Sequence, residues 1–75
     1  MKQEVLALVR SIAEDIPDDT SVDLIKEGLI DSPVMIELLT VIEEKYNIEF
    51  DGDDISKENF NCVDSMTELI KKFLS

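Results

Sequence analysis

The chain has 75 residues, of which 44% are hydrophobic, and its 18 acidic and 7 basic residues give a formal net charge of −11. This length allows one domain, and the hydrophobic fraction excludes a disordered acidic tail. The negative charge excludes binding to nucleic acid and to an anionic membrane surface, because both need clustered Lys and Arg. It predicts a protein partner with a basic patch, although an acidic surface also serves solubility alone.

The use of cysteine and histidine limits the chemistry further. Cys62 is the only cysteine, and the chain has no histidine. An intramolecular disulfide, His-assisted serine or cysteine catalysis and an ordinary zinc site are therefore excluded, while a hydrolase with a serine–lysine pair stays open. A calcium loop at residues 51–54 fails on spacing, because Ile55 stands at a ligand position, so no metal site is predicted. The N-terminus reads as neither a signal peptide nor a membrane span, which together with the single cysteine suggests the cytoplasm.

The first predicted helix covers residues 2 to about 15, and Pro17 ends it. Its apolar stripe consists of Val5, Leu8, Val9, Ile12 and Ile16. A long polar connection, residues 18–31, follows. A structureless loop of this length is unusual in a compact domain. We therefore expect its apolar side chains to fill the core, namely Val22, Leu24, Ile25, Leu29 and Ile30. We expect Gly28 to adopt a backbone angle that is closed to other residues.

The central predicted helix runs from Pro33 to about Tyr46. We place Ser32 as its N-cap, because a serine oxygen can accept a hydrogen bond from a free N–H of the first turn. Pro33 fits the first helical position, since its missing N–H would have no intrahelical partner. Asn47 ends the helix, because Asn tolerates the left-handed conformation. The predicted buried stripe is Met35, Leu38, Leu39, Ile42 and Tyr46.

The rest of the chain predicts a linker and two further helices. Ile48 and Phe50 alternate with polar residues, so the linker is extended and enters the core twice. A short helix is predicted at residues 54–58, and Phe60 is expected to fill the core. The last helix begins at residue 61 or 62 and ends near residue 74. The predicted fold class is all-α, a small antiparallel bundle of three main helices plus one short helix.

Two stretches carry a resemblance to a known family. They are Leu29-Ile30-Asp31-Ser32 before the central helix and the run Val41–Phe50 at its end. In this position they resemble the acyl carrier protein superfamily, in which the serine of an Asp-Ser motif opens the second helix and carries a 4′-phosphopantetheine arm. Glu37-Leu38-Leu39 and Phe60-Asn61-Cys62-Val63 extend the resemblance over essentially the whole chain. It implies an acyl-carrier-like fold and a single carrier domain, residues 1–75.

Two positions depart from the common pattern of that family. Pro33 follows the serine where Leu is usual, and Leu29 and Ile30 stand where many members have Gly. Gly-Leu-Ile-Asp-Ser looks more like the free-standing carriers, including D-alanyl carrier proteins, than the carriers of fatty-acid synthesis. Pro33 leaves the serine and the helix start intact, but it puts in doubt which synthase and which partners recognise the site.

The resemblance assigns roles to five residues. Ser32 becomes the attachment point of the phosphopantetheine, and Asp31 supports the attaching enzyme by contacting its metal or orienting the serine. The alternative for Asp31 is a favourable charge near a helix start. Glu37, Glu43 and Glu44 match the family's docking surface for basic patches, although a merely solvated face explains each glutamate by itself. A phosphodiester on Ser32 would place negative charge at a helix N-terminus, where free N–H groups favour an anion.

The implied function is a non-enzymatic shuttle, not an enzyme, that holds an acyl or aminoacyl group as a thioester for fatty-acid, polyketide or related biosynthesis. The alternative cargo is D-alanine or another amino acid for cell-wall or peptide biosynthesis. The expected partners are a phosphopantetheinyl transferase (holo-carrier synthase), an acyl- or aminoacyl-activating ligase, and a downstream acyltransferase or synthase. We expect a monomer that inserts into no membrane.

The same residues also allow an alternative function and a candidate cleft. A cofactor-free acidic helical interaction domain would need the acidic residues but not Ser32. Six apolar side chains could line a cleft for an acyl chain, although a plain core is the favoured interpretation. They are Leu24, Ile36, Leu39, Phe50, Phe60 and Met66.

Overall fold

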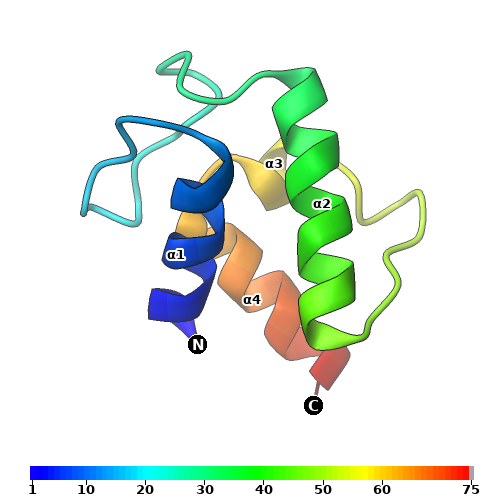
Figure 1. Cartoon of the computed structure of the whole chain (residues 1–75). Coiled ribbons are helices and arrows are strands. Elements are labelled where there is room, and N and C mark those ends of the chain that lie inside the picture. Colours follow the sequence, from blue (N-terminus) through cyan, green and yellow to red (C-terminus); the bar gives the residue numbers. More distant parts are fainter. Residues whose placement is uncertain (75) are drawn as a thin grey trace.

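A computed structural model describes residues 1–74, which form four α-helices and no strand (Figure 1). The helices are α1 (Lys2–Ile12), α2 (Ser32–Tyr46), α3 (Lys57–Phe60) and α4 (Val63–Leu74). α1 packs against α2 and α4, and α3 packs against α4. The all-α prediction of three main helices and one short helix is confirmed. Among residues 1–74, no helix is long and apolar enough to cross a membrane.

α1 ends at Ile12, earlier than the predicted residue 15. Ala13 is already extended, and Asp15 adopts the left-handed conformation with φ 60°. The Arg10 guanidinium holds the chain after the helix, because it donates a hydrogen bond to the Ile16 carbonyl at 3.1 Å. The early end lets the Ile16 side chain turn into the core, where it is buried.

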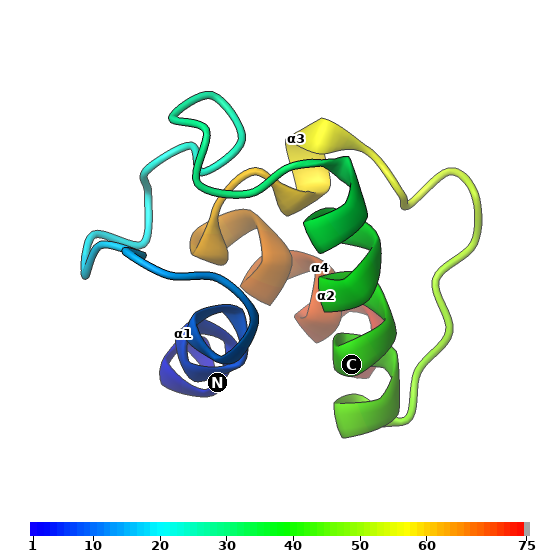
Figure 2. The same ribbon diagram turned by 45° about the horizontal axis from the view of Figure 1, so that its top comes forward.

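The long connection between α1 and α2 contributes to the core, as predicted. Figure 2 shows it passing on one side of the bundle, while residues 47–56 pass along the outer side of α2. Leu24 and Ile30 are buried, and Val22, Ile25 and Leu29 are half-buried. The connection is tied to the start of the last helix, because the Leu24 N–H donates to the Asn61 carbonyl at 2.6 Å.

The core gathers side chains from all four helices and both linkers. Phe60 is fully buried, and Phe50 packs edge to face against it with the ring centroids 5.5 Å apart. The predicted stripe of α2 is buried at Leu38, Leu39 and Ile42, whereas Met35 and Tyr46 are half-buried.

Two helix starts differ slightly from the prediction. α3 begins at Lys57 rather than near residue 54, because the Ser56 hydroxyl accepts the Asn59 N–H and fixes the N-cap there. α4 begins at Val63, and the buried Cys62 thiol accepts the Ser65 N–H at 3.4 Å. Cys62 is therefore a cap residue, in agreement with its predicted place at the start of the last helix.

Candidate functional site

The start of α2 is built by a chain of backbone hydrogen bonds. The Leu24 carbonyl accepts the N–H groups of Leu29 and Ile30 at 2.8 and 3.2 Å. This tight turn passes through Gly28, whose φ of +75° lies in the left-handed region that favours glycine. Because Leu24 is itself tied to the entry of α4, the first residue of α2 has a set position relative to the last helix.

Asp31, not Ser32, is the N-cap of α2. Its backbone is extended, and its Oδ1 accepts the Val34 N–H at 3.1 Å. Its carbonyl accepts the Met35 N–H at 2.8 Å, which is the first hydrogen bond of the helix. The prediction that Ser32 caps the helix was therefore wrong. Asp and Ser are both favoured N-caps, and here the carboxylate one residue earlier takes the position.

This shift leaves Ser32 as an exposed first helical residue. Its hydroxyl has no hydrogen-bond partner among residues 1–74, so it makes no structural contact that modification would break. Pro33, also exposed, occupies the second position of the helix, where a missing N–H costs little. The site is thus an accessible primary hydroxyl on a helix start that the preceding residue holds in place.

The start of α2 offers a phosphate fewer free N–H groups than the sequence predicted. The predicted stabilisation of a phosphate on Ser32 depended on those groups. Pro33 has none, and the Val34 N–H is already bonded to Asp31. The Asp31 carboxylate itself supplies the negative charge that the helix dipole favours. Ser32 is therefore suited to modification by its exposure rather than by a preformed anion cradle.

The exposed face of α2 runs along the helix from Ser32. Ile36 lies one turn beyond the serine and is 59% exposed, the highest value among the exposed large apolar side chains of residues 1–74. Glu37 and Glu44 are exposed, and their spacing of seven residues places them on the same face. This face combines an apolar side chain with two carboxylates, on the helix that begins at Ser32.

Glu43 differs from the other two predicted docking residues. It is half-buried, and its Oε2 accepts the Phe50 N–H at 2.8 Å. Its carbonyl also accepts the N–H groups of Asn47 and Ile48 where the helix ends. Sequence reasoning missed this structural contact, because residue spacing alone did not indicate that the linker folds back along α2.

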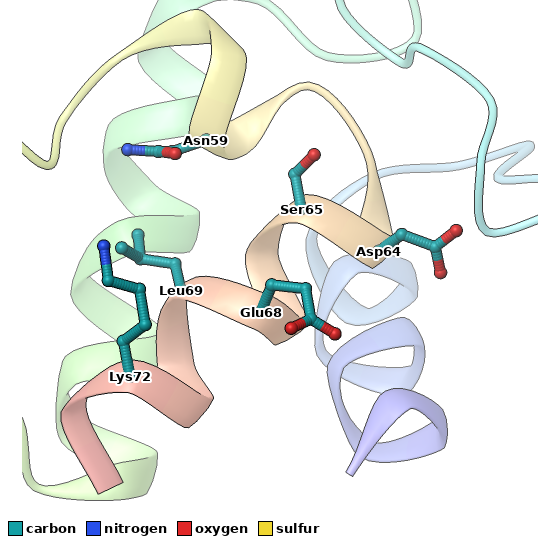
Figure 3. A pocket seen from close by; sticks show the side chains of 6 residues that line it. All are labelled: Asn59, Asp64, Ser65, Glu68, Leu69 and Lys72. Carbon is teal, nitrogen blue, oxygen red and sulfur yellow. The ribbon is translucent and has the colours of Figure 1, made fainter. Parts of the chain in front are cut away.

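The suggested apolar cleft is core, with one exception. Leu24, Leu39, Phe50, Phe60 and Met66 are all buried, whereas Ile36 lies outside. A pocket of about 290 Å³ lies instead on the surface of α3 and α4 (Figure 3). Five of the six side chains that line this pocket are polar or charged. They are Asn59, Asp64, Ser65, Glu68 and Lys72, with Leu69 as the apolar one. Neither its chemistry nor its lining connects it to Ser32.

Known proteins of similar sequence show the family of the chain. A D-alanyl carrier protein of Bacillus velezensis is 35% identical to it in an alignment that covers 91% of this chain and 95% of the relative. The protein of that name from Bacillus subtilis has the same identity and coverage. The one from Leuconostoc citreum is 28% identical over 99% of this chain and 96% of the relative. No protein-family model matches the chain. The chain is thus a carrier protein rather than an enzyme, and it belongs to the acyl carrier protein superfamily.

Proposed function

We propose that this carrier holds an aminoacyl group, in the first place D-alanine, as a thioester on a 4′-phosphopantetheine arm attached to Ser32, and delivers it to partner enzymes. The observation that carries the proposal is the Ser32 hydroxyl, which is exposed and without a partner at the start of α2. The names of the relatives support the cargo.

Ser32 and Asp31 are the residues that would hold and support the group. The group supplies a thiol at the end of a long flexible arm. The chain supplies the serine oxygen, which would form the new P–O bond while the phosphoanhydride bond of coenzyme A breaks and adenosine 3′,5′-bisphosphate leaves. The proton of that oxygen would pass to a base of the transferase. Asp31 orients the serine by capping α2 through Oδ1. We propose that the other oxygen of this exposed carboxylate contacts the metal of the transferase.

The packing of the core favours a short cargo. Leu24, Phe60 and Met66 are at most 1% exposed, so the side chains that could shelter an acyl chain are already packed together. A small polar aminoacyl group needs no such shelter. The D-alanyl names of the relatives also favour this cargo over a fatty acyl or polyketide group. A cytoplasmic location is part of the proposal, and a chain with a single cysteine and hence no intramolecular disulfide suits a reducing compartment.

The exposed face of α2 is the proposed docking surface for the transferase, the ligase and the downstream acyltransferase. Glu37 and Glu44 would pair with basic side chains, and Ile36, one turn from Ser32, would add an apolar contact. Changing Glu37 and Glu44 together to Gln should raise the KM of the transferase several-fold and weaken its dependence on salt. The melting temperature should not fall, because both side chains are exposed.

The deciding experiment is intact mass after incubation with a broad-specificity phosphopantetheinyl transferase, Mg²⁺ and coenzyme A. We expect one added phosphopantetheine, which is absent in Ser32→Ala and retained in the matched control Ser11→Ala, another exposed helical serine. The loaded protein should then gain one alanyl group with a D-alanine-activating ligase and ATP. A folded protein that several transferases leave unmodified would instead be the cofactor-free acidic interaction domain.

A further inference from the structure

Residues 23–30 form a turn that is closed by hydrogen bonds from its first two residues. The Asp23 Oδ1 accepts the Lys26 N–H at 2.9 Å, and the Asp23 carbonyl accepts the Glu27 N–H at 3.0 Å. The Leu24 carbonyl accepts the last two N–H groups of the turn at 2.8 and 3.2 Å. The turn therefore behaves as one unit, and the N-cap of α2 follows it directly.

Asn61 holds this turn at both of those residues. Its carbonyl accepts the Leu24 N–H at 2.6 Å, and its Nδ2 donates to the Asp23 Oδ2 at 3.4 Å. Asn61 is the C-cap of α3, directly before the entry to α4, and its backbone is right-handed with φ −78°. One residue at the junction of α3 and α4 thus contacts the turn through both its main chain and its side chain.

The Asn61 side chain contributes little to folding stability. A carboxylate only accepts, so the amide must present its nitrogen to Asp23. The other amide atom, Oδ1, is buried and has no hydrogen-bond partner among residues 1–74. An unpartnered buried acceptor costs free energy, which offsets the gain from a single long hydrogen bond. Alanine fits the same right-handed backbone and would remove both terms, so a role in placing the turn explains this side chain better than a role in folding.

Other contacts keep the turn attached to the core without the Asn61 side chain. The Leu24 and Ile30 side chains are at most 2% exposed. Before the turn, the Thr20 hydroxyl donates to the Asp64 Oδ1 at 2.7 Å. Losing the Asn61 amide should therefore loosen the turn without detaching it or unfolding the domain.

We propose that Asn61 is a positioning residue for Ser32 and acts through Asp23 and the turn. Apolar burial is non-directional, whereas a hydrogen bond fixes an orientation. The turn carries this orientation to the N-cap of α2 and hence to the Ser32 hydroxyl. Transfer of a phosphoryl group needs the attacking oxygen roughly in line with the leaving group, so a misplaced hydroxyl reacts more slowly. The effect on the rate rests on the proposed function, whereas the placement of the turn does not.

The placement is tested in the free protein by amide hydrogen exchange of the ¹⁵N-labelled chain. In Asn61→Ala the Leu29 and Ile30 amides should exchange several-fold faster than in the wild type, relative to the Ile42 amide in the middle of α2. Asn59→Ala is the matched control, because the Asn59 Nδ2 donates to a carbonyl of the other linker, at 2.8 Å. Equal exchange at Leu29 and Ile30 in the two variants would overturn the placement.

The effect on Ser32 is tested by the steady-state kinetics of phosphopantetheine loading, below the melting temperature of every variant. Asn61→Ala should lower kcat several-fold and leave KM unchanged, because the exposed face of α2 is not altered. Asn59→Ala should leave both constants at their wild-type values. An unchanged kcat in Asn61→Ala, or a rise in KM alone, would overturn the positioning role.

Exchanging the two side chains provides a rescue at constant net charge. Asn61→Asp places two carboxylates against each other and should lower kcat further than Asn61→Ala does. Adding Asp23→Asn restores an amide–carboxylate hydrogen bond with donor and acceptor exchanged, and the introduced amide oxygen can still accept the Lys26 N–H. The kcat of the double variant should therefore exceed that of Asn61→Asp. No recovery would show that position 61 does not act through Asp23.

The wild-type chain separates this inference from the proposed function. If the wild type and Asn61→Ala are loaded with equal kcat, the carrier proposal stands and the positioning role fails. If several transferases leave the wild type unmodified, the carrier proposal and the effect on loading fail together, while the exchange of Leu29 and Ile30 still decides the placement of the turn.

Discussion

Thr20 in the long connection and Asp64 in the first turn of α4 hold each other by two hydrogen bonds. The Thr20 hydroxyl donates to the Asp64 Oδ1 at 2.7 Å, and the Asp64 N–H donates to the Thr20 carbonyl at 3.1 Å. Lys2, at the start of α1, places its Nζ 3.1 Å from the same carboxylate oxygen. This contact joins three parts of the chain that are far apart in sequence, and it orders the connection that leads to Ser32.

Replacing Asp64 by Asn should lower the melting temperature at pH 7 but not near pH 2. The hydrogen bond from Thr20, followed by the hydrogen bond from Lys2 and then the charge of Lys2, holds the pKa of Asp64 below its usual value. A carboxyl whose pKa is lower in the folded state stabilises the fold above its unfolded pKa of about 3.9. This contribution disappears as pH falls through the lower, folded pKa.

Thermal unfolding of the wild type and Asp64→Asn from pH 2 to 7 checks this prediction. Thr20→Val removes the other side chain of this hydrogen bond. In its background, Asp64→Asn should lower the melting temperature at pH 7 by less than it does in the wild type. If the difference in melting temperature between wild type and Asp64→Asn is the same at pH 2 and pH 7, the prediction is contradicted.

Replacing Asp51 by Asn should raise the melting temperature at neutral pH. A side-chain hydrogen bond with Asp54, together with the charge of Asp54, raises the pKa of Asp51. The folded state therefore binds a proton at Asp51 more readily than the unfolded state does. The cost of the charged form is full at neutral pH and vanishes below the unfolded pKa of about 3.9.

Calorimetry of Asp51→Asn at pH 7 and pH 3 tests this second pH dependence. Glu14→Gln, at an exposed position, is the control for the general relief of repulsion in a chain of net charge −11. The stabilisation by Asp51→Asn should exceed that by Glu14→Gln at pH 7 and vanish at pH 3.

Asp31→Ala should destabilise the protein by about 1 kcal/mol, the usual effect of losing an N-cap. Ser32→Ala should change the stability by less than about 0.5 kcal/mol, because the serine is exposed and caps nothing. Urea denaturation measures both differences. Asp31→Asn is the control that keeps a cap oxygen and removes the charge. A larger loss of folding stability in Ser32→Ala than in Asp31→Ala would show that Ser32, and not Asp31, caps α2.

Gly28→Ala should cost about 1 kcal/mol of folding stability, because its φ of +75° is unfavourable for a residue with a Cβ. The open space around Gly28 excludes a steric clash as the cause. Gly52→Ala is a matched control. Space is also open there, but φ is not positive, so stability should stay equal or rise slightly. Equal losses in the two variants would show that the left-handed turn is not the reason.

The helical class, the order of the elements and most of the core could be predicted from the amino-acid sequence. The apolar period of α2 predicted the burial of Leu38, Leu39 and Ile42, because a helix that packs on one side must repeat its apolar residues at that spacing. The isolated apolar residues Leu24 and Phe60 were also predicted to be buried, since the connections were too long to remain structureless. Ser32 stood out through the order of turn, Asp-Ser pair and helix.

The contacts between separate segments of the chain could not be predicted in this way, because they depend on how the folded domain packs. Asp31 and Ser32 are adjacent and equally good caps, and the turn fixed by Leu24 and Gly28 selects Asp31. Glutamate is usually a surface residue, yet the linker folds back along α2 and its Phe50 N–H donates a hydrogen bond to the Glu43 carboxylate. Local preference and periodicity act within a few residues along the chain, whereas these choices depend on backbone groups brought together by the packing of the whole domain.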